Sequence, residues 1–189
     1  MPMGWNTDVN AAALGEVTLG AAKDMESCVY ITVGTGIGGG AVVNGEPVSG
    51  LGHPEMGHFY PPRHPKDTYE GTCSFHGDCL EGLAAGPSIE ARYGIKGQDL
   101  PEDHEAWEIE AHYLAHAAMA YTTILSPECI VFGGGVMQQE HLFELVHEKF
   151  EQILADYLTL PPTSEYIISP GLGTDAGILG SLMLAKNAL

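Results

Sequence analysis

Basic residues are scarce in this 189-residue chain, which has 7 Lys and Arg against 25 Asp and Glu and a formal net charge of −18. Nucleic acids and anionic membranes are bound through clusters of cations, so the composition argues against both partners. No apolar run approaches the ~18 residues that a membrane span needs, and residues 1–5 lack the basic and apolar regions of a signal peptide. We therefore expect a cytoplasmic protein.

Cysteine is also scarce, with four residues in the chain. Four are too few at this length for a disulfide scaffold, and two of them, Cys73 and Cys79, lie close to histidines. This pattern favours a reducing compartment and a bound metal. Hydrophobic residues make up 44% of the chain, enough for a sizeable core in one large or two small domains.

The hydrophobic pattern predicts strands that alternate with helices. Strands are expected at 28–33, 40–43, 129–132 and 166–168, and helices at 11–23, about 105–125, about 139–157 and from about 175. Such alternation is typical of an α/β sheet with mixed or parallel pairing. Because no strand precedes the first helix, we expect an N-terminal segment of the domain to be missing from this chain.

Three glycine-rich segments stand beside these predicted elements, at Gly34–Gly40 (GTGIGGG), Gly133–Gly135 and Gly171–Gly177. Glycine lets backbone N–H groups approach and cradle a phosphate. Gly34–Gly40 lacks the GK[ST] ending of a P-loop, and a tight hairpin turn is its alternative interpretation. Ligands of open α/β sheets gather at the carboxyl ends of strands, so the three segments suggest one nucleotide-sized cleft. With few cations available, backbone dipoles and Mg²⁺ would meet the phosphate charge.

A cluster of cysteine and histidine predicts a metal site. Cys73, His76 and Cys79 lie within seven residues, and His58 lies fifteen residues before Cys73. Two thiolates and two imidazoles suit a closed tetrahedral Zn²⁺ site that would stabilise an irregular loop. The alternative is a pair of buried cysteines with solvent-exposed histidines. His53 and His64 are competing ligands that the spacing does not exclude.

Five motifs occur in order along nearly the whole chain: TDVNAAALGE at 7–16, GTGIGGG at 34–40, HPEMGH at 53–58, the cluster at 73–79 with Leu80-Glu81, and FGGGV at 132–136. This arrangement resembles the ROK family of sugar kinases. Within that family, the Thr-Asp pair and the Cys-x-x-His-x-x-Cys spacing look most like the bacterial zinc-containing fructokinases.

The resemblance implies the actin-like (ribonuclease H-like) ATPase fold, with a mixed sheet flanked by helices. Residues 1–189 would form the C-terminal domain, with a zinc-binding loop at about 53–82. The N-terminal domain and its Asp-x-Gly-Gly-Thr phosphate loop would be absent, so the chain would bind zinc but not turn over by itself. The family commonly forms homodimers.

The resemblance also assigns roles on the sugar side of the site. Asp8 would be the general base, although its position alone suggests a helix N-cap. Glu55, His58 and Glu81 would hold sugar hydroxyls, and His58 would also bind zinc through its other ring nitrogen. Without the motif, Glu55 and Glu81 would be interpreted as plain surface carboxylates.

On the nucleotide side, Gly34, Thr35 and Gly36 would contact the ATP phosphates, and Gly133 and Gly134 would lie against the adenosine. Mg²⁺ would accompany ATP. A structural Zn²⁺ would be held by four ligands: His58, Cys73, His76 and Cys79.

The expected function is therefore ATP-dependent phosphorylation of fructose to fructose 6-phosphate. A mannose or glucose kinase of the same family is one alternative. A second is the sugar-sensing domain of a ROK-type transcriptional repressor, which the Asp8 carboxylate disfavours because a sensor needs no base. A third is a zinc-stabilised binding module without catalysis.

Overall fold

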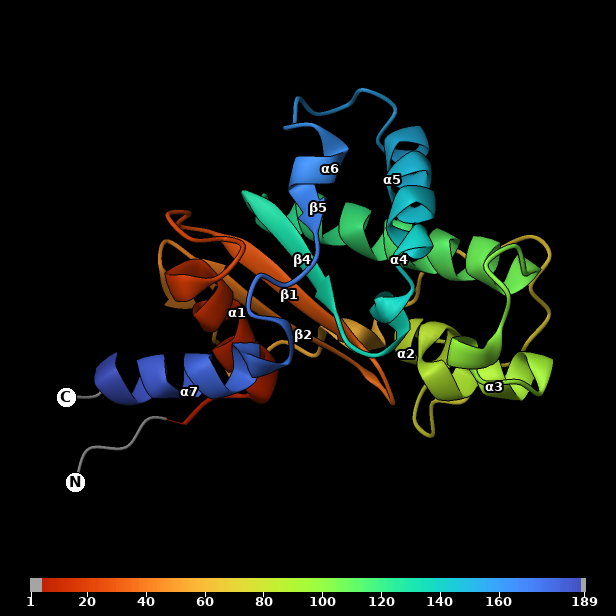
Figure 1. Cartoon of the computed structure of the whole chain (residues 1–189), viewed down its shortest axis with the longest axis horizontal. Coiled ribbons are helices and arrows are strands. Elements are labelled where there is room, and N and C mark those ends of the chain that lie inside the picture. The colour runs from red at the N-terminus through yellow and green to blue at the C-terminus, as the bar shows by residue number, and fades with distance from the viewer. Residues whose placement is uncertain (1–4, 188–189) are drawn as a thin grey trace.

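A mixed sheet of five strands forms the centre of the structure, a computed structural model that describes residues 5–187 (Figure 1). Residues 1–4 and 188–189 lie outside the described residues, and with them most of the segment in which a signal peptide was sought. The strand order is β3-β2-β1-β4-β5. The strands are β1 Cys28–Val33, β2 Ile37–Val43, β3 Glu46–Pro47, β4 Cys129–Gly133 and β5 Ile167–Ile168.

The pairing of the strands is mixed, as the sequence predicted. β1 pairs antiparallel with β2 and parallel with β4, and β4 pairs parallel with β5. The turn between β2 and β3 has positive φ at both Asn44 and Gly45, +53° and +76°. Two such residues give the backbone the twist that a two-residue hairpin requires, which confirms the turn predicted there.

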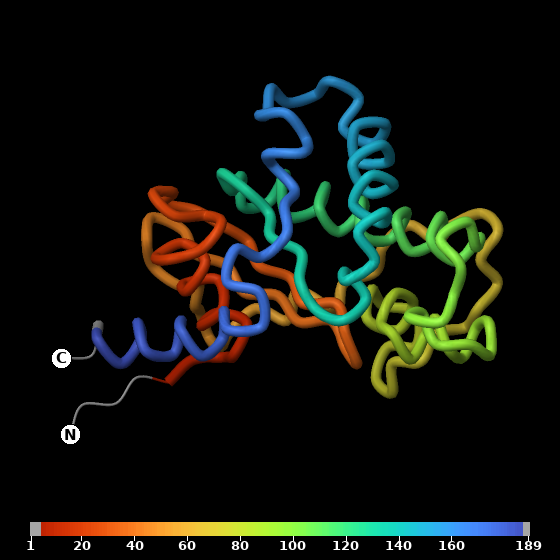
Figure 2. Tube along the Cα trace, viewed as in Figure 1, coloured from red at the N-terminus to blue at the C-terminus, as the bar shows by residue number. Residues whose placement is uncertain are grey.

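Helices cover both faces of the sheet. They are α1 Asp8–Leu19, α2 Leu80–Ala84, α3 Gly86–Tyr93, α4 Glu105–Leu125, α5 His141–Leu154, α6 Thr163–Tyr166 and α7 Ala176–Asn187. Alternate residues of β1 point to opposite faces. Val29 and Ile31 join the core beneath α4 and α5, whereas Cys28 and Tyr30 join the smaller core beneath α1 and α7. Figures 1 and 2 show these two pairs of helices on either side of the sheet.

The first helix begins and ends earlier than predicted. The Thr7 hydroxyl accepts the N–H of Asn10 at 3.2 Å and caps the helix, so α1 begins at Asp8 and ends at Leu19. The N-cap interpretation of Asp8 is therefore wrong, because Asp8 lies in the first helical turn. The capping hydroxyl satisfies a backbone donor that would otherwise have no partner.

Two helices between the predicted elements were missed. α2 and α3 are short, and only Ala85 separates them. They lie in a segment without the apolar period of 3.6 residues that identifies a helix. The strand predicted at 166–168 begins one residue later, because the turn of α6 includes Tyr166.

α1 and α7 cross at very short range because glycines face each other. A Cβ on Gly180 would lie 1.6 Å from the carbonyl oxygen of Ala11, and one on Gly15 would lie 2.7 Å from that of Ala176. Only glycine fits at such approaches. The crossing places the first turn of α1 beside the start of α7.

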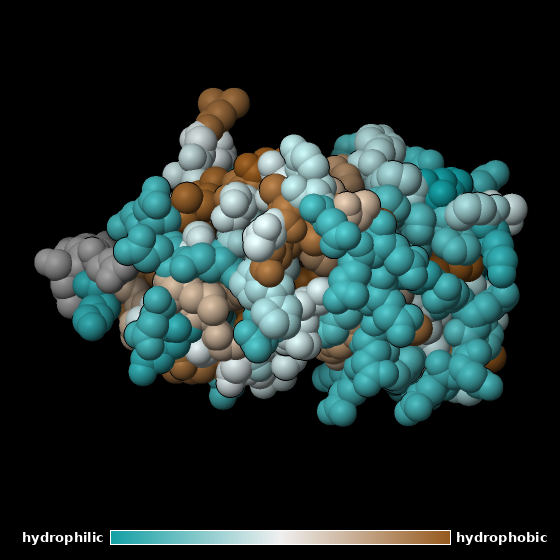
Figure 3. All heavy atoms as spheres, turned by 90° about the horizontal axis from the view of Figure 1, so that it is seen from above, coloured by the Kyte–Doolittle hydropathy of each residue, from teal (hydrophilic) through white to brown (hydrophobic). Residues whose placement is uncertain are grey.

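The surface reflects the acidic composition. Hydrophilic side chains gather on the right-hand part of the face in Figure 3, and apolar ones show at its centre and left. None of the helices within residues 5–187 combines the length and the apolar character that crossing a membrane requires.

Candidate functional site

The glycine-rich segments meet at one edge of the sheet. β1 and β4 are parallel neighbours, with Thr32 opposite Gly133, so the segments that follow them leave the sheet side by side. Three adjoining cavities of about 480, 370 and 500 Å³ share Gly135 in their lining. The sequence predicted this convergence, because parallel strands end at the same edge.

The GTGIGGG segment is also a hairpin turn. The N–H of Gly34 donates to the carbonyl of Gly36 at 2.9 Å, and β2 begins at Ile37. The hairpin alternative is thus confirmed. It is compatible with a ligand site, because Gly34, Thr35 and Gly36 all line the 500 Å³ cavity.

That cavity also brings together the acidic and imidazole side chains singled out in the sequence. Asp8 enters it from α1, Glu81 from the first turn of α2, and Glu55 and His58 from the segment before and within a short 3₁₀ turn at Met56–His58. Residues more than seventy positions apart in the chain therefore face one space. Three carboxylates and an imidazole beside a glycine loop can accept and donate hydrogen bonds to a polyol.

Glu81 links the two sides of this cavity. One carboxylate oxygen accepts the N–H of Ile37 at 2.9 Å, and the other lies 4.0 Å from Nε2 of His58. A Cβ on Gly36 would lie 2.6 Å from the first oxygen. Glycine at position 36 therefore lets the carboxylate reach the hairpin.

Asp8 presents an exposed carboxylate to the same cavity. One of its oxygens accepts the N–H of Val9 at 2.9 Å. The helix beneath it is fixed by Asn10, whose buried side chain accepts the N–H of Ala41 at 3.1 Å and donates to Asn6 at 2.7 Å. Sequence analysis missed Asn10. Its signal was a polar residue directly before an apolar helical run.

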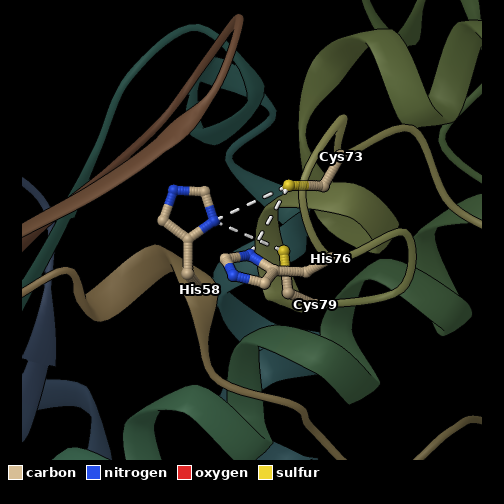
Figure 4. A group of neighbouring side chains, drawn as sticks. All are labelled: His58, Cys73, His76 and Cys79. Carbon is tan, nitrogen blue, oxygen red and sulfur yellow. Dashed lines mark hydrogen bonds between the residues drawn. The ribbon is translucent and has the colours of Figure 1, made fainter.

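Four side chains form a compact group of potential metal ligands (Figure 4). His58 Nδ1 lies 3.8 Å from Cys73 Sγ and 3.5 Å from Cys79 Sγ, and His76 Nδ1 lies 3.8 Å from Cys73 Sγ. With usual Zn–S and Zn–N bond lengths, the edges of a tetrahedral site measure about 3.3 to 3.8 Å. The three separations lie close to that range, and all four ligand atoms lie within 4.8 Å of one another, so the group has the donor set and the approximate spacing of a tetrahedral metal site.

The two competing histidines lie elsewhere. Nε2 of His53 pairs with the Glu55 carboxylate at 2.9 Å, and both side chains are exposed. The ring of His64 packs edge-to-face against His112, with ring centroids 4.9 Å apart. Neither belongs to the ligand group.

The two thiols differ in acidity. The N–H groups of His76 and Phe75 lower the pKa of the Cys73 thiol, which favours the thiolate that a metal binds. Burial raises the pKa of Cys79 to about 11.

The second glycine segment requires glycine for two reasons. Gly134 has φ of +93°, and a Cβ there would lie 2.4 Å from the carbonyl oxygen of Val33. A Cβ on Gly133 would lie 2.7 Å from the hydroxyl of Tyr30. The 370 Å³ cavity opens between this segment and the start of α7. The 480 Å³ cavity adds Lys96, a cation that the sequence did not single out.

Fold and site together define an α/β domain of the actin-like ATPase fold, with glycine loops at one sheet edge. The model of the ROK family matches residues 1–188, and the chain belongs to the ROK family. The predicted fold class and the resemblance are confirmed.

Relatives carry kinase names. The chain is 52% identical over 193 residues to the "Putative fructokinase" of Bacillus subtilis (strain 168), covering 100% of this chain and 64% of the relative. It is 48% identical over 190 residues to the "Fructokinase" of Streptococcus mutans serotype c, covering 98% and 64%. Among solved structures, the ROK hexokinase from Thermus thermophilus matches with a TM-score of 0.77 and 31% identity, over 95% of this chain and 63% of that one. The chain thus spans less than two thirds of the length of these relatives.

Proposed function

We propose that this chain is the part of a ROK-family fructokinase that supplies the catalytic base, the sugar site and part of the ATP site. The observation that carries the proposal is the 500 Å³ cavity, where Asp8, Glu55, His58 and Glu81 face the Gly34–Gly39 hairpin. A sugar bound there would have hydroxyls next to the three carboxylates and the proposed phosphate loop. The names of the relatives support a kinase that acts on fructose, and ATP is the proposed phosphoryl donor.

Each side chain has a part in this proposal. The exposed Asp8 carboxylate accepts the proton of the attacking hydroxyl. Glu55, Glu81 and His58 Nε2 orient the sugar, and the backbone N–H groups of Thr35 and Gly36 stabilise the charge on the transferred phosphoryl group. Gly133 and Gly134 lie against the adenosine. Mg²⁺ bound to ATP supplies further charge neutralisation, which suits a chain with so few cations.

Zinc has a structural role in the proposal. His58, Cys73, His76 and Cys79 would hold it, fixing the loop at about 53–82. Since Nδ1 of His58 faces the thiols, its Nε2 remains directed toward Glu81 and the cavity. A fixed ring orientation preorganises that nitrogen for a sugar hydroxyl.

The proposal includes a partner segment. The part of the relatives that this chain does not span would supply the second phosphate loop, and the complete enzyme would act as a cytoplasmic homodimer. The chain alone would then bind zinc and ligands without turning over.

A fusion tests this proposal. The chain is assayed alone and joined to the unmatched part of the Bacillus subtilis relative, with fructose, mannose and glucose as acceptors. We expect fructose phosphorylation by the fusion only, and a loss of roughly 10²- to 10⁴-fold in kcat with Asp8→Asn. Preferred turnover of mannose or glucose would assign another hexose. Sugar binding without turnover by the fusion would indicate a sensor. Turnover by the chain alone would contradict the proposal that the active site also needs the unmatched part of the relative.

A further inference from the structure

Glu16, near the end of α1, is a fully buried carboxylate to which the mechanism above gives no part. No ion pair within residues 5–187 involves it. Burying a carboxylate is costly unless other groups satisfy it. The groups that donate hydrogen bonds to Glu16 therefore indicate its structural role.

Three backbone N–H groups satisfy this carboxylate. Ala21 donates to Oε2 at 2.7 Å, Gly171 to the same oxygen at 3.0 Å, and Leu172 to Oε1 at 3.1 Å. The first donor follows α1 in the chain, and the other two come from the segment before α7, more than 150 residues away. Hydrogen bonds to an ionised acceptor are about twice as strong as neutral ones.

The backbone packs so closely around the Glu16 carboxylate that two neighbouring positions must be glycine. A Cβ on Gly20 would lie 2.0 Å from Oε2 of Glu16, and one on Gly171 would lie 2.5 Å from the nitrogen of Ala21. Glycine at both positions lets the two segments close around the carboxylate. The segment 170–177, which we call the α7 loop, is thus held to the end of α1.

The α7 loop in turn forms a wall of the site. Pro170, Gly173, Thr174 and Gly177 line the 370 Å³ cavity opposite Gly133–Gly135. Pro170 is in direct contact with this segment, because a Cβ on Gly133 would lie 2.9 Å from its Cγ. The position of Gly171, fixed by Glu16, therefore sets the position of Pro170 against Gly133.

We propose that Glu16 is a positioning residue that sets nucleotide affinity by holding the α7 loop against Gly133–Gly135. The inference rests on the proposed function, in which this glycine segment contacts the adenosine. Glu16 itself touches no ligand. It acts through Gly171 and Pro170.

Glu16→Gln tests this in the 189-residue chain. Glutamine keeps the size of the side chain but turns an amide NH₂ toward at least one backbone donor. Mg·ADP binding is measured by calorimetry, and we expect it to weaken about tenfold, as loss of one such hydrogen bond predicts. Amide exchange at Gly171 and Leu172 should become faster. Fructose binding should not change, because Glu55, His58 and Glu81 lie on other elements and Asp8 lies at the opposite end of α1 from Glu16.

The matched control is Glu110→Gln, which replaces a buried carboxylate on α4 that has no hydrogen-bond partner among residues 5–187. Its Mg·ADP affinity should equal that of the wild type. If Glu16→Gln does not fold, Glu16→Asp keeps the charge and withdraws the carboxylate by one bond, about 1.5 Å. It should weaken Mg·ADP binding while zinc content stays unchanged.

Two results would overturn this inference and leave the proposed function standing. One is an unchanged Mg·ADP affinity in both Glu16 variants. The other is an equal fall in fructose and Mg·ADP affinity, which indicates a general loss of structure. A wild-type chain that binds fructose but no Mg·ADP would instead contradict the nucleotide site of the proposed function, and this inference with it.

Discussion

The Glu81 carboxylate accepts the N–H of Ile37 at 2.9 Å, joining the start of α2 to the β1–β2 hairpin. A side chain expected to hold the sugar is thus also a support of the proposed phosphate loop. Because the second oxygen lies 4.0 Å from Nε2 of His58, one carboxylate connects the proposed sugar site, the group of potential metal ligands and the glycine hairpin. Several tests follow from this connection.

Gly36→Ala should weaken fructose binding about tenfold while the protein stays folded. The added Cβ would lie 2.6 Å from a Glu81 oxygen, and the flexible carboxylate can withdraw only by losing its bond to Ile37. Calorimetry with fructose measures the effect. Gly52→Ala, where a Cβ meets open space, is the control. Equal affinities in both variants would refute the link between hairpin and sugar site.

Removing the proposed zinc ion should loosen the loop at 53–82 and leave the sheet intact. We expect a strong chelator to lower Tm by about 5 to 10 °C, because structural zinc contributes directly to folding. His76→Gln should lose bound zinc, whereas His64→Gln should retain it, since only the former lies in the ligand group. Metal analysis of the purified variants decides this. Zinc lost from His64→Gln and kept by His76→Gln would reverse the ligand assignment.

A buried ion pair should hold the same loop independently of the metal. Asp67 accepts two hydrogen bonds from Arg92, at 3.1 and 2.9 Å, and one from the Tyr113 hydroxyl at 2.6 Å. Asp67→Asn should lower the free energy of unfolding by about 3 to 5 kcal/mol, because Arg92 would be left as an unpaired buried charge. Urea denaturation measures it. The exposed Arg63–Asp78 pair is the control, and Asp78→Asn should cost at most about 1 kcal/mol.

The stability that Asp67 provides should depend on pH. Burial alone would raise the pKa of its carboxyl, but the hydrogen bonds from Tyr113, Tyr69 and Arg92 lower it below the ordinary value. A carboxylate with a depressed pKa stabilises the fold fully at pH values above its unfolded pKa of about 4. This stabilisation is lost as the pH falls through the lower pKa of the folded state. The wild type should therefore lose stability below about pH 4 more steeply than Asp67→Asn. Parallel profiles would contradict this.

Glu110 should show the opposite dependence. Burial raises the pKa of this carboxyl well above its usual range, and neither oxygen has a hydrogen-bond partner in the part of the chain that the structure describes. A raised acid pKa costs stability as the pH increases above the unfolded value of about 4.3. Glu110→Gln should thus unfold at a higher temperature than the wild type at pH 8, with little difference at pH 4. Thermal melts at both pH values check this, and a variant less stable at pH 8 would contradict it.

Much of the site could be predicted because its signals are local. The spacing of cysteine and histidine predicted a ligand group around Cys73, His76 and Cys79, but it left His53 and His64 as alternatives to His58, and the fold brings His58 to the two thiols. The glycine segments were visible because only glycine permits their close contacts. By contrast, Glu16 carried no local signal. Its partners lie in the α7 loop, and a single glutamate in an acidic chain cannot be distinguished from a surface residue.

The sequence by itself indicated four of the five strands of the described residues, the long helix at 105–125, the glycine turns and family membership, because these depend on residue type and short-range period; it missed β3 and the first three residues of β2. The tertiary structure decided which hydrogen-bond donors each carboxylate meets. It placed Glu81 beneath the hairpin, Asp67 against Arg92, and Glu16 among three backbone donors. A carboxylate's role depends on which segments the fold brings within about 3 Å of it, and no local pattern encodes that.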